Sequence, residues 1–285
     1  MPNQHPHRSV LYMPGANPRA LAKGRTLAAD ALIFDLEDAV GPDDKPEARR
    51  AVAAALAEGG FGARRIAIRI NGADTPWGQE DLESAVAAGP DAILVPKVNA
   101  PSDIAAVAER IGDRPIAIWA MMETAAGMLR AAEIAAAPGL EAFVIGTNDL
   151  ARELGCRFRP DRLPLLTGLG LAVLAARAEG LLCIDGVYNA FRDTEGLEQE
   201  CLQGRDLGMD GKTLIHPSQI ETANRVFAPS ADDIAEAEAV VAAFRAAGGG
   251  VAVLDGRIVE GLHVEMADAT LARAAAIATL EAASA

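Results

Sequence analysis

The chain has 285 residues, of which 26 are Lys or Arg and 40 are Asp or Glu, so its net charge is -14 and its isoelectric point is near 4.7. Because nucleic-acid binding needs many cationic contacts to phosphate, this balance excludes an extended nucleic-acid surface. No stretch approaches the roughly 18 uninterrupted apolar residues of a membrane span, and the first ten residues lack the apolar core of a secretion signal, so we expect a cytoplasmic protein.

Short β-type runs recur along the chain, with Ala-rich helical segments between them. Most are apolar almost throughout, which is typical of parallel strands covered on both faces. Eight strands alternating with helices predict a (β/α)8 TIM barrel. The alternative is a doubly wound open sheet, whose glycine fingerprint after the first strand is absent. The predicted strands are 9–13, 31–36, 65–70, 92–97, 116–121, 142–146, 181–187 and 212–216.

The chain is predicted to divide into a barrel over 1–225 and an appended segment over 226–285. The appended segment reads as a polar helix, a glycine break from Gly248 to Gly250, a hairpin over 251–261 and an Ala-rich terminal helix. A closed barrel does not need this tail. We therefore expect a lid or an oligomer-forming arm, hinged at the glycines, that covers the site of its own or a neighbouring subunit.

Polar residues fall at the ends of the predicted strands, where the catalytic groups of TIM barrels lie. Met121 and Met122 are expected to fill the barrel core, and His216 is read as a structural, hydrogen-bonded residue. The polar residues at the strand ends are Asp35, Glu37, Asp38, Arg69, Asn71, Lys97, Glu123, Thr124, Thr147, Asn148, Asp149, Asp185 and His216.

Glu123 and Asp149 are one βα repeat apart, so their carboxylates are expected on adjacent strand ends. Neighbouring strands lie ~4.8 Å apart, and two carboxylates that close repel each other unless a cation lies between them. Oxygen ligands favour Mg²⁺ over zinc. The alternative is that both residues cap helices. Arg69 ends an apolar strand and is a candidate clamp for a substrate carboxylate or carbonyl, or an ion-pair partner of Glu37 or Asp38.

With its residues laid out in this way, the chain resembles the citrate lyase β-subunit-like (HpcH/HpaI aldolase) superfamily of CoA-thioester enzymes. Seven motifs in order, one at nearly every strand end, carry the resemblance over nearly the whole chain. They are RSVLYMPG (8–15), FDLEDAV (34–40), RING (69–72), VPKV (95–98), MMETAAGM (121–128), GTNDL (146–150) and GKTLIHPSQIETAN (211–224).

The resemblance implies a homo-oligomer, a trimer or hexamer, of TIM barrels acting on a small CoA thioester. It implies Mg²⁺, or Mn²⁺ in its place, on Glu123 and Asp149, with Arg69 as the catalytic arginine. By the same resemblance, the acidic Glu37 and Asp38 hold metal-bound waters. CoA is expected along the loop after the first strand, at Tyr12, Pro14 and Lys23.

Within the superfamily the chain is most similar to the malyl-CoA thioesterase branch, which implies hydrolysis of (3S)-malyl-CoA to malate and CoA. Malyl-CoA lyases usually carry Arg where Asn17 stands, and at Glu260 an Asp that a neighbouring subunit delivers as the catalytic acid/base. Glu260 keeps that carboxylate but moves it by ~1 Å. The alternatives are a lyase that cleaves malyl-CoA or citramalyl-CoA to a 2-oxo acid and acetyl-CoA, and an acyl-carrier-dependent subunit of a citrate lyase complex.

Overall fold

The computed structural model describes residues 5–248 and 250–284, so Gly249 of the predicted glycine break lies outside the described residues. Eight parallel strands form a closed barrel in chain order, and the pairing of Ser9 with Lys212 joins the first strand to the last. The TIM-barrel prediction is therefore confirmed. The strands are β1 (Ser9–Pro14), β2 (Ala31–Asp35), β3 (Arg65–Arg69), β4 (Ala92–Val95), β5 (Ala117–Met122), β6 (Leu140–Ile145), β7 (Leu182–Asp185) and β8 (Gly211–Leu214).

Each barrel strand is largely buried on both faces, which explains why several strand sequences are apolar almost throughout. β8 differs, because its buried Lys212 is ion-paired. Side chains that point outward pack against the helices, and those that point inward form a separate cluster inside the barrel. Trp119 is fully buried in the inner cluster, where alanines such as Ala67, Ala92 and Ala142 leave room for its ring. Met121 and Met122 are buried as predicted, and Met121 belongs to the inner cluster.

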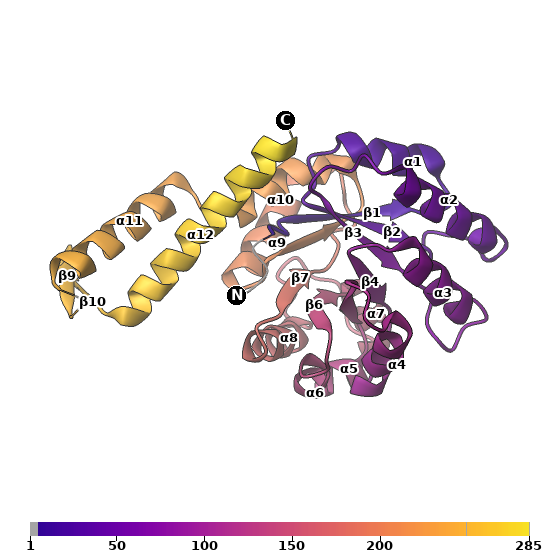
Figure 1. Ribbon diagram of the computed structural model, residues 1–285. Helices are drawn as coiled ribbons and strands as arrows, with labels where there is room; N and C mark the ends of the chain where they lie inside the picture. Colours follow the sequence, from indigo (N-terminus) through magenta and orange to yellow (C-terminus); the bar gives the residue numbers. More distant parts are fainter. Residues whose placement is uncertain (1–4, 249, 285) are drawn as a thin grey trace.

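Helices surround the barrel (Figure 1). Asn17 caps the first helix by accepting a hydrogen bond from the Ala20 N–H at 3.1 Å, with Pro18 in the first helical position. The barrel helices are α1 (Pro18–Lys23), α2 (Lys45–Glu58), α3 (Gly78–Ala88), α4 (Pro101–Ile111), α5 (Ala125–Leu129), α6 (Ala131–Ala135), α7 (Thr147–Leu154), α8 (Leu166–Ala178), α9 (Thr194–Asp206) and α10 (Ile220–Phe227).

The C-terminal segment forms an arm of two antiparallel helices, α11 (Ala231–Ala246) and α12 (Gly261–Ser284), with a hairpin of β9 (Ala252–Leu254) and β10 (Arg257–Val259) between them. Small and branched side chains such as Ala237, Val241 and Ala267 pack the two helices together. Among the described residues, none of these or the other helices combines the length and apolar character that crossing a bilayer demands.

The arm is attached to the barrel through the second half of α12. Arg8 contacts Glu281 at 3.0 Å, and Arg273 donates to the Asp210 carbonyl at 2.6 Å. Arg8 and Asp210 directly precede β1 and β8, so the attachment lies at the N-terminal end of the barrel. The hairpin lies at the far end of the arm from the barrel (Figure 1). A lid over the site of the same chain, one of the expected arrangements, is therefore not formed.

The last barrel helix, α10, ends at Phe227, whose side chain is buried in the core, and the arm begins at Ala231. The expected boundary after residue 225 falls inside α10.

Asp185, expected at a strand end, is fully buried and binds Arg162 at 2.7 Å and Lys212 at 3.0 Å. The Lys212 ammonium donates further to the Gly186 carbonyl and to Glu200, so each of its three hydrogens has an acceptor.

Replacing Lys212 by Met should leave Asp185 and Glu200 with one cation fewer inside the barrel wall. Removing one partner from a buried ionic network costs about 3–5 kcal/mol, so we expect the free energy of unfolding in urea to fall by that amount. Arg50→Met, which removes an exposed arginine paired with Glu47, should change it by less than about 0.5 kcal/mol. Equal free energies of unfolding for the two variants would show that the buried ion-pair network does not stabilise the barrel.

Candidate active site

Arg69 is the last residue of β3 and is held by carboxylates from β2 and the loop after it. Its Nε and Nη2 donate to the two Asp35 oxygens at 2.7 and 2.6 Å, and Nη1 lies 2.9 Å from Glu37 Oε2. Asp38 is more distant, at 3.6 Å, and mostly exposed. Burial opposes the charge, yet the carboxylate of Asp35 raises the pKa of Arg69 well above its ordinary value. The expected ion pair with Glu37 is present, but the principal partner, Asp35, was missed.

Glu123 directly follows β5, and its side chain is buried at 2 % exposure. Its Oε1 accepts the backbone N–H of Lys97 at 2.8 Å, and among the described residues it has no ion-pair partner within 4.0 Å. Burial raises its pKa to about 7, and the nearby charges of Glu37 and Asp149 act in the same direction. Glu123 is thus a buried carboxylate whose charge its neighbours do not compensate.

Asp149 lies in the first turn of α7, next to Glu123, with a partly exposed carboxylate 2.5 Å from Arg152. The two acids are close enough for Asp149 to raise the pKa of Glu123. Thr124, not Glu123, caps α5, so the helix-cap alternative fails for Glu123. A methyl group at Gly146 would lie 2.3 Å from Glu123 Oε2, so this turn needs glycine to leave room for the carboxylate.

The carboxylates of Glu123 and Asp149 fit a divalent cation by their chemistry. Two carboxylate oxygen donors, of which Glu123 has no ion-pair partner among the described residues and Asp149 is paired only with the exposed Arg152, favour a hard cation. The small number of protein ligands suits Mg²⁺, which keeps water or substrate oxygens in its shell. No group of three or more His, Cys, Asp or Glu side chains in the described part of the chain is arranged as a closed metal site. A structural zinc site of such ligands is not formed there.

Two side chains hold the backbone of the loop after β2 by hydrogen bonds to its carbonyl groups. Lys45 is buried and donates to the carbonyls of Leu36 and Glu37, both at 2.9 Å, while Asn71 donates to the Leu36 carbonyl at 2.7 Å. These hydrogen bonds keep the backbone of Glu37 and Asp38 close to Arg69. The sequence placed Asn71 at a strand end and did not indicate the role of Lys45.

The three residues expected to bind CoA lie at different depths. The Tyr12 ring is partly buried beneath Arg69, 4.8 Å from its guanidinium carbon, and its hydroxyl points to Met121 Sδ at 3.8 Å. Burial raises the pKa of Tyr12. Pro14 ends β1 and is partly exposed, and Lys23 is exposed in the last turn of α1. Tyr12 thus belongs to the Arg69 cluster, whereas Lys23 lies at the surface.

Glu260 is exposed in the hairpin region of the arm, where its backbone N–H donates to His263 Nδ1 at 3.0 Å. Because the hairpin points away from the barrel (Figure 1), the chain does not bring Glu260 together with Arg69, Glu123 and Asp149. His216 has the structural role expected of it, since it bonds Ser218 at 2.7 Å and stacks on Phe191.

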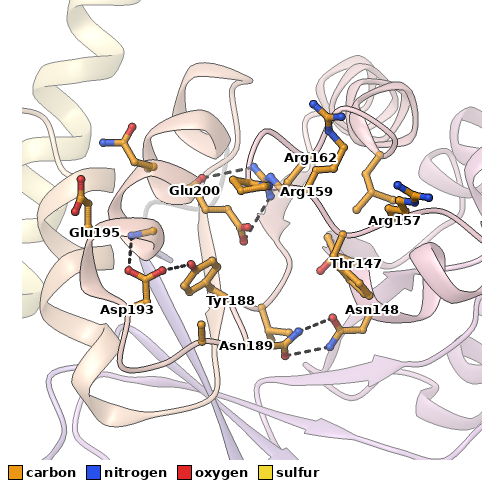
Figure 2. A pocket seen from close by; sticks show the side chains of 17 residues that line it. Thr147, Asn148, Arg157, Arg159, Arg162, Tyr188, Asn189, Asp193, Glu195 and Glu200 are labelled. Atoms are coloured by element: carbon orange, nitrogen blue, oxygen red, sulfur yellow. Dashed lines mark hydrogen bonds and ion pairs between the residues drawn. The ribbon is translucent and has the colours of Figure 1, made fainter.

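A cavity of about 650 Å³ opens beside Thr147 and Asn148 and was missed by the sequence reasoning (Figure 2). Its other walls come from the loop over 157–165 and from a segment over 187–200, which comprises the loop after β7 and the first turns of α9. The amides of Asn148 and Asn189 bond each other at 2.8 and 3.2 Å, and the Tyr188 hydroxyl donates to Asp193 at 2.6 Å. Nothing in the spacing of the sequence motifs indicated a cavity here.

Residues 8–217 match the model of the HpcH/HpaI aldolase/citrate lyase family. The chain belongs to this family. A "(3S)-malyl-CoA thioesterase" of Cereibacter sphaeroides is 59 % identical over 98 % of each chain, and an "L-malyl-CoA/beta-methylmalyl-CoA lyase" of Rhodobacter capsulatus is 34 % identical over 94 % of each. A crystal structure of CitE from Mycobacterium tuberculosis with magnesium, acetoacetate and coenzyme A superposes with a TM-score of 0.81, at 30 % identity over 96 % of this chain and all of that one.

The HpcH/HpaI match ends before the arm, whereas the two sequence relatives align over nearly the full chain. The barrel therefore carries what the family shares. The arm, which includes Glu260, lies outside the family match but inside the alignments with the thioesterase and the lyase.

Replacing Glu123 by Gln should abolish Mg²⁺ binding and stabilise the metal-free protein at high pH. The pKa of Glu123 is about 7 when folded, above its ordinary value of 4.5, so the folded state keeps this proton up to higher pH than the unfolded state does. Its contribution to stability is therefore present at low pH and lost as the pH rises through 7. The difference in melting temperature, variant minus wild type, should be positive at pH 8 and shrink towards pH 5.

The matched control is Glu83→Gln on the exposed side of α3, which should change neither property. Calorimetric titration with Mg²⁺ gives the affinity, and thermal unfolding in chelator gives the pH profile. A pH-independent difference in melting temperature would contradict the raised pKa, and retained Mg²⁺ binding would remove Glu123 from the metal site.

Proposed function

We propose that this chain is a Mg²⁺-dependent thioesterase that hydrolyses (3S)-malyl-CoA to malate and CoA. One observation carries the proposal: the malyl-CoA thioesterases of Cereibacter sphaeroides are 57–59 % identical over 96–98 % of both chains, while the malyl-CoA lyase and citrate lyase relatives are 34–35 % identical. The geometry of the barrel mouth supports it, because the buried carboxylate of Glu123 beside Asp149 suits a divalent cation and Arg69 suits an anionic acyl group.

In this proposal Glu123 and Asp149 hold the metal, and Glu37 and Asp38 hold waters around it. Bound Mg²⁺ supplies positive charge that polarises substrate oxygens. Arg69, fixed by Asp35, adds the catalytic cation that orients the malyl group. CoA extends from Tyr12 past Pro14 towards Lys23 at the surface.

The hydrolytic step needs a base for water. A carboxylate takes a proton from water, the water oxygen attacks the thioester carbon, the carbon–sulfur bond breaks, and the CoA thiolate leaves and takes up the proton. We assign the base to Glu260 of a second copy of the chain. The hairpin and the start of α12 expose several apolar side chains suited to a partner surface, namely Val251, Val253, Ile258, Leu262 and Met266.

A receiving surface on the second copy is the cavity beside Thr147, with Phe158 exposed at its edge. An arm that enters this cavity would exclude water from the mouth and bring a carboxylate to it. The proposed assembly is a homo-oligomer, a trimer or a hexamer, in which each arm completes a neighbouring site.

The decisive experiment incubates pure protein and Mg²⁺ with (3S)-malyl-CoA and separates the products by chromatography. We expect malate and CoA. Glyoxylate and acetyl-CoA would instead identify a lyase. No turnover of free CoA thioesters, together with co-purification of an acyl-carrier protein, would identify a subunit of a citrate lyase complex.

Glu260→Gln and Glu123→Gln should each be inactive alone, because each removes a different part of the site. Mixing the two variants and allowing subunits to exchange should restore activity, since some sites then combine an intact Glu123 with an intact Glu260 of another copy. Mixing each variant with itself is the control. Absence of complementation, with oligomers shown to exchange, would place Glu260 outside the site.

Residue 260 should also influence which reaction occurs. Glu260→Asp shortens the side chain by ~1 Å, a shift that can cost on the order of 10²-fold in rate. We expect slower malate formation and a larger share of glyoxylate from malyl-CoA, measured as a product ratio. An unchanged ratio would mean that residue 260 does not choose between hydrolysis and cleavage.

A further inference from the structure

Lys97 follows β4 with a backbone conformation that a residue with a Cβ seldom adopts. Its φ is 51°, and only Arg162 and Asp255 share a positive φ among the described non-glycine residues. Such conformations persist where the surroundings impose them, and they concentrate at functional sites. The sequence placed Lys97 at a strand end on the catalytic face but assigned it no role.

The backbone of Lys97 is fixed to the neighbouring loop independently of its side chain. Its N–H donates to Glu123 at 2.8 Å, and its carbonyl accepts from Asn99 Nδ2 at 2.9 Å. Asn99 Oδ1 in turn accepts from the Thr124 hydroxyl at 2.7 Å. Lys97 therefore leaves its strand beside the proposed metal ligand, and changes to its side chain need not displace Glu123.

The ammonium group of Lys97 reaches from β4 to the loop after β2, where its Nζ donates to Glu37 Oε1 at 2.8 Å. Its side chain is 43 % exposed, although its partner Glu37 is buried. An ammonium has three hydrogens, and the contact with Glu37 uses one. The remaining donors are available to a ligand that enters the barrel mouth.

Arg69 has only part of its hydrogen-bonding capacity left for the malyl group that it orients. Asp35 occupies its Nε and Nη2 as a bidentate partner, and Nη1 faces Glu37 and Met121. Only 8 % of its side chain is exposed. Of these two cations that contact Glu37, Lys97 is the one exposed to an oxygen atom of a ligand that enters from solvent. If Lys97 binds the ligand instead of Glu37, Glu37 can remain paired with Arg69.

We propose that Lys97 is a further substrate-binding residue, whose ammonium binds the carboxylate of the acyl group. The assignment rests on the proposed function for the identity of that group. A cation on Glu123 and Asp149 balances those two acids, and Asp35 already balances Arg69. The acyl carboxylate adds one more negative charge, which the exposed face of Lys97 compensates without desolvating another group.

The test measures binding of malate, the expected product, at saturating Mg²⁺ by calorimetry. Lys97→Met should raise the malate dissociation constant about 10- to 100-fold, as expected for loss of a hydrogen bond to a charged group. Lys97→Arg, which keeps the charge, should recover most of the affinity. Mg²⁺ alone should bind Lys97→Met as tightly as wild type or more tightly, because a nearby positive charge is gone.

CoA affinity and melting temperature should stay unchanged in Lys97→Met, and Arg50→Met on the exposed face of α2 serves as the charge-matched control. Lys97→Gly is a second variant that accepts the positive φ without strain and should show the same malate defect. Unchanged malate affinity overturns the proposal, as does parallel loss of Mg²⁺ and malate binding, which would indicate a positioning role. If wild type binds malate through Lys97 but does not hydrolyse malyl-CoA, the proposed function fails and the carboxylate site stands.

Discussion

The constraint on which the site depends is a buried carboxylate without a cation of its own. Glu123 is held by one backbone N–H, faces Asp149 and Glu37, and has a pKa of about 7. Glu123 has no ion-pair partner among the described residues because the nearby cations are bound to other carboxylates. Arg69 binds Asp35, and Lys97 binds Glu37. If either cation were free to pair with Glu123, the carboxylate would be neutralised internally. The two ion pairs therefore preserve a negative site that an external cation can fill, at the expense of stability in its absence.

The side chains at the barrel mouth fall into two groups, those that hold other protein groups in place and those that are left to bind a ligand. Asp35 holds the side chain of Arg69 at the end of β3, and Lys45 and Asn71 hold the backbone of the loop that carries Glu37. Glu123, Asp149 and Lys97 instead keep donors or acceptors that protein partners do not exhaust. The first group lies at the end of β2, at the start of α2 and just after β3. In the second group, Lys97 and Glu123 lie in the turns after β4 and β5, and Asp149 lies in the first turn of α7.

Much of the fold followed from the sequence, because strands buried on both faces are apolar throughout and the βα repeat fixes the order of the strand ends. The adjacency of Glu123 and Asp149 followed from the same repeat. The partner of Arg69 did not, since Asp35 reaches it only through the register of β2 against β3, which pairs these two residues. The positive φ of Lys97 has no signature in a Val-Pro-Lys segment. The cavity beside Thr147 is lined by the segments 157–165 and 187–200, which are distant in sequence, and Arg162 of the first segment is anchored to Asp185 at the end of β7.

The direction of the arm was the least predictable feature, and it bears on how the enzyme can be assembled. Contacts of α12 with the N-terminal end of the barrel hold the arm away from the mouth of its own chain. If Glu260 acts at all, it acts in another copy, and the active unit is then the oligomer. Dilution that separates the copies would remove the base while leaving each barrel folded and its carboxylates in place. Under that arrangement Mg²⁺ binding is a property of one chain, whereas turnover depends on protein concentration.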